Sequence, residues 1–218
     1  MTSQQGDRVP IDPQSVDAPL SAFAVFLVVS IVPGQEDAVR AVIADVESIT
    51  RAVGFRDLDG QLSCIVGIGS DAWDRFGLDG KPRQLHPFAA VSGRVHTAVS
   101  TPGDLLFHIR AQRADLCFEF ERILLDRLGA SITVEDEVQG FRYFDSRDLL
   151  GFVDGTENPT GRGMAQATLI ADDPQFEGGS YVVVQKYLHD LEGWNGQPTS
   201  IQEHIIGRTK ADNVELDD

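Results

Sequence analysis

Short apolar runs alternate with helical stripes of apolar residues in the first part of the chain. Phe23–Val29 is an unbroken β-branched and aromatic run that ends before a Pro-Gly turn, which indicates a central strand buried on both faces. In Gln35–Val53 apolar residues recur every three or four positions, so this spacing predicts one amphipathic helix that stops at Gly54. In Leu62–Ile68 an apolar residue then stands at every second position, which predicts a half-buried strand.

A second strand-helix-strand pattern follows a loop rich in glycine, proline and charge. Leu105–Ile109 predicts a strand, and Ala114–Leu128 predicts a helix capped by Gly129. Apolar and polar residues alternate again from Ile132, which predicts a strand leading to Phe144. The order β-α-β-β-α-β is typical of a ferredoxin-like domain, so the predicted fold class is α+β.

The remaining residues predict the beginning of a second ferredoxin-like domain. Tyr181–Tyr187 is strongly β-prone, and Leu188–Ile206 predicts a loop and a short helix. We therefore divide the chain into a flexible N-terminal tail (1–20), a ferredoxin-like domain (21–150), and a motif loop with an incomplete second ferredoxin-like domain (151–218). The unpaired edge at Tyr181–Tyr187 predicts pairing with another chain, or partial disorder after Gly163.

Charge and composition narrow the function classes. The 218 residues carry a net charge of -16, which disfavours nucleic acid and anionic membranes as partners and favours small neutral or cationic ligands. The apolar runs are too short to span a bilayer and the start of the chain has no apolar signal region, so we predict a cytoplasmic protein. Cys64 and Cys117 form no C-x-x-C pair, which indicates buried thiols in a reducing compartment.

The segment most informative about chemistry is Gly151–Pro159, which reads G-F-V-D-G-T-E-N-P. Two glycines bracket Asp154 and permit close backbone approach, while the apolar residues before it predict a partly apolar pocket around the carboxylate. A ligand-binding loop and a simple Asp-Gly turn between two domains are both compatible with this pattern. A calcium loop is excluded, because a frame starting at Asp154 has Pro159 where glycine is needed and Ala165 where glutamate is needed.

Gly151–Pro159 resembles the G-x-x-D-G motif of dye-decolourising-type (DyP) haem peroxidases, in the extended form of their bacterial members. Further segments resemble that family in the same order, and together they extend over roughly Phe23 to Asp218. They are Gly69–Asp74, Leu85–Phe88, Thr101–Arg110, Gly178–Tyr181, Val184–Asp190 and Ile206–Lys210.

This resemblance implies two ferredoxin-like domains with haem b held between them. It also implies that hydrogen peroxide is used for one-electron oxidation of dyes, phenols or Mn(II), with Asp154 as the distal acid and base. Gly155, Thr156 and Glu157 are expected to line the haem edge by contiguity. By the same resemblance we expect a homo-oligomer, small aromatic reductants, and packaging inside an encapsulin shell.

Weaker candidates also follow from the resemblance, each with a simpler alternative. Glu157 and Glu215 match carboxylates near the haem propionates in some relatives, where manganese could bind, although solvated surface acids have the same pattern. Aromatic residues could relay electrons to bulky substrates or could only pack. They are Trp73, Trp194, Tyr143, Tyr181 and Tyr187.

The iron ligand is not expected within this sequence. In the family the proximal histidine follows the E-L-D-D segment and the distal arginine comes later, so both are expected past Asp218. The five histidines present do not occupy that position; they are His86, His96, His108, His189 and His204. Three hypotheses remain: part of a peroxidase, a non-catalytic structural or cargo subunit, and a haem-binding sensor or dechelatase-like protein.

Overall fold

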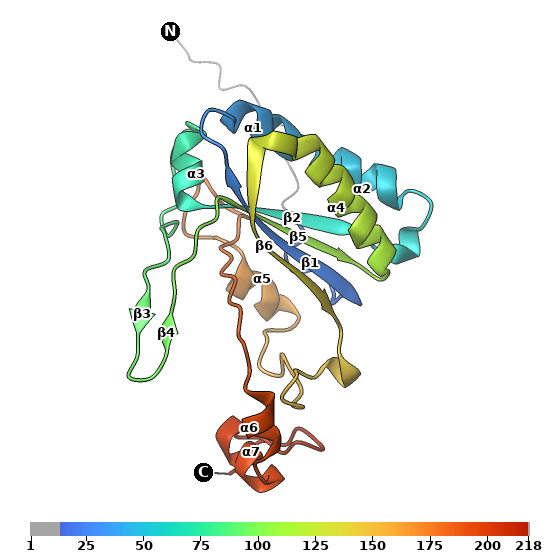
Figure 1. Cartoon of the computed structure of the whole chain (residues 1–218), viewed down its shortest axis with the longest axis vertical. Helices are drawn as coiled ribbons and strands as arrows, with labels where there is room; N and C mark the ends of the chain where they lie inside the picture. Colours follow the sequence, from blue (N-terminus) through green and yellow to red (C-terminus); the bar gives the residue numbers. More distant parts are fainter. Residues whose placement is uncertain (1–13, 218) are drawn as a thin grey trace.

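The computed structural model describes residues 14–217, and its centre is one antiparallel sheet (Figure 1). Its strands are β1 (Phe23–Ile31), β2 (Ser63–Ile68), β5 (Leu105–Ala111) and β6 (Ile132–Phe141). They lie in the order β2-β5-β1-β6, with every neighbouring pair antiparallel. This is the arrangement of a ferredoxin-like β-α-β-β-α-β unit and confirms the predicted α+β fold class.

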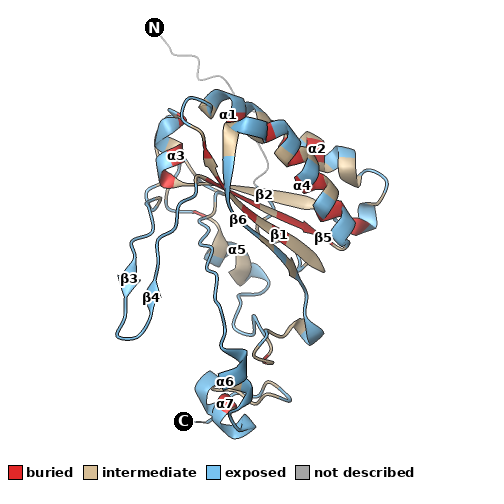
Figure 2. Ribbon diagram, in the orientation of Figure 1, coloured by how far each residue is buried: buried red, intermediate tan, exposed pale blue. Residues whose placement is uncertain are grey.

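Three helices cover one face of this sheet: α1 (Glu36–Ala44), α2 (Val46–Gly54) and α4 (Ala114–Leu128). The core lies between these helices and the sheet (Figure 2). Alternate residues of β1 and β5 point into it, and Leu27, Phe107 and Ile109 are fully buried. The predicted bounds of α4 and its Gly129 C-cap agree with the structure.

Two details of the predicted first unit are wrong. The helix expected over Gln35–Val53 breaks at Asp45 into α1 and α2; the apolar stripe continues across the break because both helices face the same sheet. The β1 strand is buried on one face only, with Val25 and Leu27 in the core and Phe26 between them half-buried. The reason is that all three packing helices lie on the same side.

Short elements occupy the connections and the second half of the chain. They are the single-turn helices Leu58–Gly60, Gly129–Ser131 and Phe144–Ser146, α3 (Ser70–Arg75), the hairpin β3 (Val91–Ser92) and β4 (Thr97–Ala98), α5 (Arg162–Thr168), α6 (Leu191–Asn195) and α7 (Thr199–Ile206). None of the helices in the described range 14–217 is both long enough and apolar enough to cross a membrane.

The strand predicted over Tyr181–Tyr187 is not formed. This segment is extended and crosses the sheet face opposite the helices. The Val182 side chain lies over Gly67 of β2, where an added Cβ would stand 3.2 Å from Val182 Cγ1, and Lys186 Nζ pairs with Asp136 of β6 at 2.9 Å. Within the described range its backbone groups make no backbone hydrogen bonds, and Val183 is 70% exposed. A β-prone sequence becomes a strand only where a neighbour supplies backbone partners. Pairing with another chain stays a prediction.

The beginning of the chain is partly attached to the sheet. Residues 1–13 of the predicted flexible tail lie outside the described residues. Gln14 pairs through its side-chain amide with both backbone groups of Val66, at 2.9 and 2.7 Å, on the outer edge of β2. Arg110 Nη2 donates to the Ser15 carbonyl at 2.9 Å. Gln14 and Ser15 are therefore attached to the sheet, and the flexibility of the tail (1–20) stays a prediction.

Candidate functional site

The loop that carries Asp154 is closed on itself by backbone pairing. Arg147 and Val153 form an antiparallel bridge, and Asp148 donates through its backbone N–H to the Phe152 carbonyl at 2.9 Å. Phe152 N–H donates in turn to Asp148 Oδ1 at 3.0 Å, and the Phe152 ring is buried. The chain reverses at Gly151, where φ is +90°, a conformation that favours glycine. The first motif glycine is thus required by the turn.

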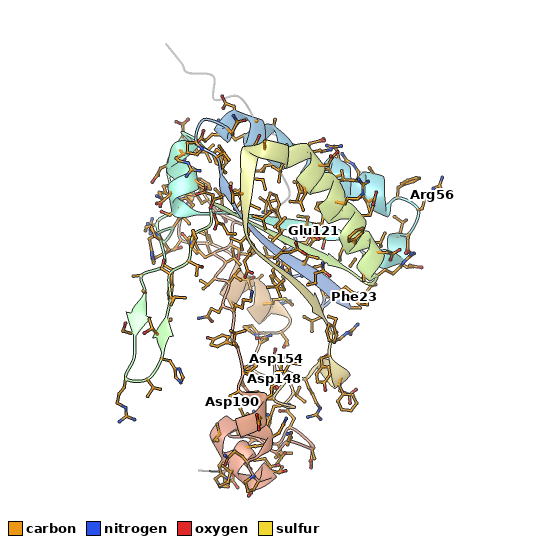
Figure 3. All side chains as sticks on the ribbon, viewed as in Figure 1. Phe23, Arg56, Glu121, Asp148, Asp154 and Asp190 are labelled. Carbon is orange, nitrogen blue, oxygen red and sulfur yellow. The ribbon has the colours of Figure 1, made fainter. Side chains whose placement is uncertain are left out.

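Asp154 projects from the end of this closed turn (Figure 3). Its backbone N–H donates to the Ser146 carbonyl at 2.9 Å, and its Oδ1 accepts from the Gly155 N–H at 2.8 Å. The other carboxylate oxygen has no hydrogen bond to any residue in the described part. The side chain is exposed, so the partly apolar pocket predicted around this carboxylate is not formed by residues 14–217. The arrangement presents an oriented carboxylate with one free oxygen.

Arg147 joins the Asp154 loop to the end of the described chain. Its Nη1 donates to the carbonyls of Gly151 at 2.9 Å and Lys210 at 2.6 Å, and its Nη2 donates to the Ala211 carbonyl at 3.1 Å. Its Nε is buried and has no hydrogen-bond partner within the described residues. Lys210 also lies against Gly151, where an added Cβ would stand 2.6 Å from the Lys210 Cε. Sequence reasoning missed Arg147 because its partners are all backbone carbonyls.

Trp194 supports the same loop from helix α6. Its indole N–H donates to the Leu150 carbonyl at 2.9 Å, and its ring meets the Phe152 ring edge-on with centroids 6.1 Å apart. Lys210 Nζ lies 5.5 Å from the Phe152 centroid and donates to Gln202 Oε1 at 2.7 Å. Phe152 is therefore held between a tryptophan and a lysine that are distant in sequence.

The residues after Asp154 are connected to the last described segment through Arg208. Its Nη1 lies 3.2 Å from Glu157 Oε1 and 3.9 Å from Glu215 Oε2, while Asn213 Nδ2 donates to Thr156 Oγ1 at 3.0 Å. Both carboxylates are largely exposed, so these ion pairs contribute little stability. The structure thus brings the predicted Glu157 and Glu215 to one guanidinium. In residues 14–217 no group of three or more His, Cys, Asp or Glu side chains is placed to hold a metal.

The other aromatic candidates are dispersed. An open depression of about 430 Å³ beside the loop includes Tyr143, Arg147 and Lys210 in its lining. Trp73 lies elsewhere, with its indole N–H bonded to the Gly80 carbonyl. Tyr181 accepts from the Gln84 backbone through its hydroxyl, and Tyr187 is exposed. Only Tyr143 and Trp194 of the five are connected to the motif loop.

None of the five histidines makes a hydrogen bond or ring contact with the motif within the described range. His108 stacks on Phe26 on the sheet face opposite the helices, with centroids 4.3 Å apart. Burial, with a smaller effect of the Arg110 charge, lowers the pKa of His108 to about 4. Burial also raises the pKa of the Cys64 thiol to about 12 and that of Cys117 to about 11. Both cysteines are unpaired; Cys117 is buried and Cys64 partly so.

The antiparallel α+β architecture and the glycine-bracketed aspartate loop agree with two family models. The model described as "Dyp-type peroxidase, N-terminal" matches residues 13–142, and "Dyp-type peroxidase, C-terminal" matches residues 145–218. The chain belongs to the Dyp-type peroxidase family, a family of enzymes.

Curated and solved relatives support the same assignment. The chain is 52% identical to a dye-decolorizing peroxidase of Rhodococcus erythropolis over 96% of its length, and 51% identical to one of Mycobacterium tuberculosis over 95%; it covers 62% of each. DyPB from Rhodococcus jostii RHA1 superposes with a TM-score of 0.91 at 57% identity, over 94% of this chain and 67% of that one.

An encapsulated DyP-type peroxidase from Mycobacterium smegmatis gives a TM-score of 0.92 at 53% identity, over 95% of this chain and 67% of that structure. Variants of the Rhodococcus DypB have been solved in complex with heme, and another in complex with manganese. The chain spans about 62% of the length of the Rhodococcus erythropolis and Mycobacterium tuberculosis relatives.

Proposed function

We propose that this chain supplies the distal side of a haem b peroxidase that uses hydrogen peroxide for one-electron oxidation of dyes, phenols or Mn(II). The observation that carries the proposal is the oriented Asp154 carboxylate, held with one oxygen free on a loop closed by backbone pairing. The heme complexes of a relative at 57% identity support the choice of cofactor.

The described residues fit one side of such a cofactor. Asp154 offers a free oxygen, and Arg147 and Lys210 in the lining of the neighbouring depression supply positive charge for an anionic group. Gly155, Thr156 and Glu157 would line the cofactor edge. When bound, haem would supply the iron and the redox chemistry.

The role of the protein residues is proton handling and orientation. Asp154 can accept a proton from one peroxide oxygen through its free oxygen and return it to the other, acting as general base and then as general acid. The Gly155 N–H fixes Oδ1 at 2.8 Å and thereby the plane of the carboxylate. Arg147 and Trp194 keep the loop in place from outside the reacting group.

Substrates and partners follow as parts of the same proposal. Tyr143 and Trp194 are the aromatic residues connected to the loop, and they are our candidates for contact with bulky reductants. Glu157 and Glu215, drawn together by Arg208, are our candidates for Mn(II). The encapsulated relative supports packaging in an encapsulin shell, and we propose a homo-oligomer located in the cytoplasm.

The decisive experiment combines haem binding with a matched pair of variants. The purified chain is titrated with hemin, followed by the Soret absorption and by peroxide-dependent dye oxidation. Asp154→Asn is expected to lower the dye-oxidation rate by about 10²–10⁴-fold, the usual range for a general acid or base, without loss of the Soret band. Asp212→Asn, in an exposed residue of the segment near the loop, is the control and should change neither readout. An unchanged rate in Asp154→Asn would remove the proposed role.

A non-catalytic structural or cargo subunit is the alternative. It predicts no specific Soret band on hemin addition and unaltered assembly with other copies or a shell. A stoichiometric Soret band with peroxide turnover would exclude it.

A further inference from the structure

Residues 86–102, which we call the arm, project from the sheet as a hairpin built on β3 and β4 (Figure 1). Every residue of the arm is exposed, as its colour in Figure 2 shows. The two strands pair only at Val91 with Ala98 and at Ser92 with Thr97. Within the described range, no hydrogen bond or ion pair connects an arm residue to a residue outside the arm. An isolated two-stranded hairpin is marginally stable in water, so the arm is suited to contact with another surface.

The base of the arm is fixed to the body of the molecule on both sides. Before the arm, the Gln84 N–H donates to the Tyr181 hydroxyl at 2.9 Å. After it, Asp104 Oδ2 accepts from the Ile31 N–H and from Arg75 Nη2, both at 2.7 Å. The fold therefore sets the direction in which the arm leaves the sheet, while the arm itself stays exposed.

The side chains of the arm differ from those of the rest of the surface. Val91, Val95 and Val99 are 61%, 76% and 64% exposed. Arg94, between the two strands, forms no ion pair within residues 14–217. All 34 acidic residues of the chain lie outside the arm. An apolar surface with a free cation is complementary to a surface that carries acidic groups, and each copy of this chain supplies such groups in excess.

The two edges of the central sheet are protected against pairing with another chain, whereas the arm is not. The side chain of Gln14 occupies both backbone groups of Val66 on the β2 edge. The β6 edge carries three consecutive acidic residues, Glu135–Glu137. Covering contacts and charges of this kind prevent association through edge strands. In the arm, β3 and β4 pair only with each other and have no acidic residue, so each keeps an unprotected edge.

We propose that the arm is a dimerisation element that docks on the acidic surface of a second copy of this chain. The arm of the second copy docks in return, about a two-fold axis. Arg94 pairs with acidic side chains of the second copy, and the valines supply the apolar contact. Residues 86–102 and the surface that they cover together approach the about 20–30 residues per side of a stable interface. This inference rests on the homo-oligomer of the proposed function and is independent of the haem site.

Sedimentation equilibrium of the purified chain measures the Kd of the dimer and tests the proposal with two matched pairs of variants. Arg94→Glu should weaken the dimer by about tenfold or more, because it replaces attraction to acidic groups by repulsion. Arg56→Glu makes the same change in net charge at an exposed residue far from the arm (Figure 3) and should leave the Kd unchanged. Val95→Asp places a charge in the apolar contact and should weaken the dimer by about 10–100-fold. Leu58→Asp, at a residue that is 82% exposed, is its control.

The outcomes separate this inference from the proposed function. A chain that remains monomeric would overturn both the arm contact and the proposed homo-oligomer. A dimer with the same Kd in the arm variants and in their controls would overturn the arm contact alone. Neither result bears on hemin binding or dye oxidation.

Photo-cross-linking identifies the partner directly. A benzoylphenylalanine replaces Val95, and this chain is mixed with a heavy-isotope-labelled unmodified chain before illumination. Cross-linked peptides that join the two kinds of chain support the proposal. Cross-links confined to one chain, or no cross-links, contradict it.

Discussion

Arg147 Nη1 donates a hydrogen bond to the Gly151 carbonyl oxygen at 2.9 Å, and the same atom donates to the Lys210 carbonyl at 2.6 Å. One guanidinium therefore fixes the Asp154 loop to a segment far along the chain. Lysine retains the charge but offers no planar set of donors that can reach several carbonyls together.

Arg147→Lys is accordingly expected to loosen the loop. Hydrogen bonds from charged donors contribute about 1.5–3 kcal/mol each, and we expect a loss of this order in the local opening free energy of the loop. Amide exchange at Gly151 and Asp154 should accelerate, while exchange in the core strand β1 stays unchanged. If amide exchange at Gly151 and Asp154 is as slow in Arg147→Lys as in the unmodified chain, Arg147 does not hold the loop.

Gly151→Ala tests the turn at the start of the motif. Its φ of +90° costs an alanine about 1–2 kcal/mol, and its Cβ would also displace the Lys210 side chain from its bond to Gln202. Gly161→Ala is the control, since φ there is +56° but a Cβ would meet no atom within 4 Å. Urea unfolding should show a larger decrease in the free energy of unfolding for Gly151→Ala than for Gly161→Ala. Equal decreases would mean that the Lys210 contact contributes nothing.

His108 predicts a pH dependence of stability. Its folded pKa of about 4 lies below the ordinary value of 6.5, so between these values the unfolded chain binds more protons than the folded one. The free energy of unfolding should therefore increase as the pH rises across this window. This gain in stability should disappear as the pH falls back through the window. His108→Phe, which keeps an aromatic ring against Phe26, should flatten that slope between pH 6.5 and 4, measured by urea unfolding.

His204→Gln on α7 is the control for His108, because this histidine is exposed. Its pH profile should follow that of the unmodified chain. Parallel profiles for His108→Phe and the unmodified chain would contradict the assignment of the slope to His108.

Leu27→Ala tests the core of the sheet. Leu27 is fully buried beneath the helices, and truncation of such a leucine costs about 2–5 kcal/mol. Leu188→Ala, at a residue that is 92% exposed, should change the free energy of unfolding by no more than about 0.5 kcal/mol. Chemical denaturation followed by tryptophan fluorescence measures both, and a small loss in Leu27→Ala would place the core elsewhere.

Features that depend on near neighbours in the chain were predictable from the sequence. The bounds of α4 and the alternate residues of β2 that pack against the core follow from periodicity. The family resemblance assigned Asp154 as the distal acid and expected Gly155, Thr156 and Glu157 to line the haem edge, and this contact with the haem stays a prediction. The proton-transfer role of Asp154 stays a prediction.

The remaining features depended on tertiary contacts. A continuous apolar stripe does not reveal the break at Asp45. The β-prone Tyr181–Tyr187 is not a strand because none of its neighbours among residues 14–217 offers it backbone partners. Arg147 contacts backbone carbonyls, which carry no sequence signature. Glu121 lies at a core position of α4, and its Oε1 is buried without a hydrogen-bond partner among residues 14–217. Sequence periodicity determines which faces are apolar, whereas packing alone decides which polar groups meet and which are buried without a partner.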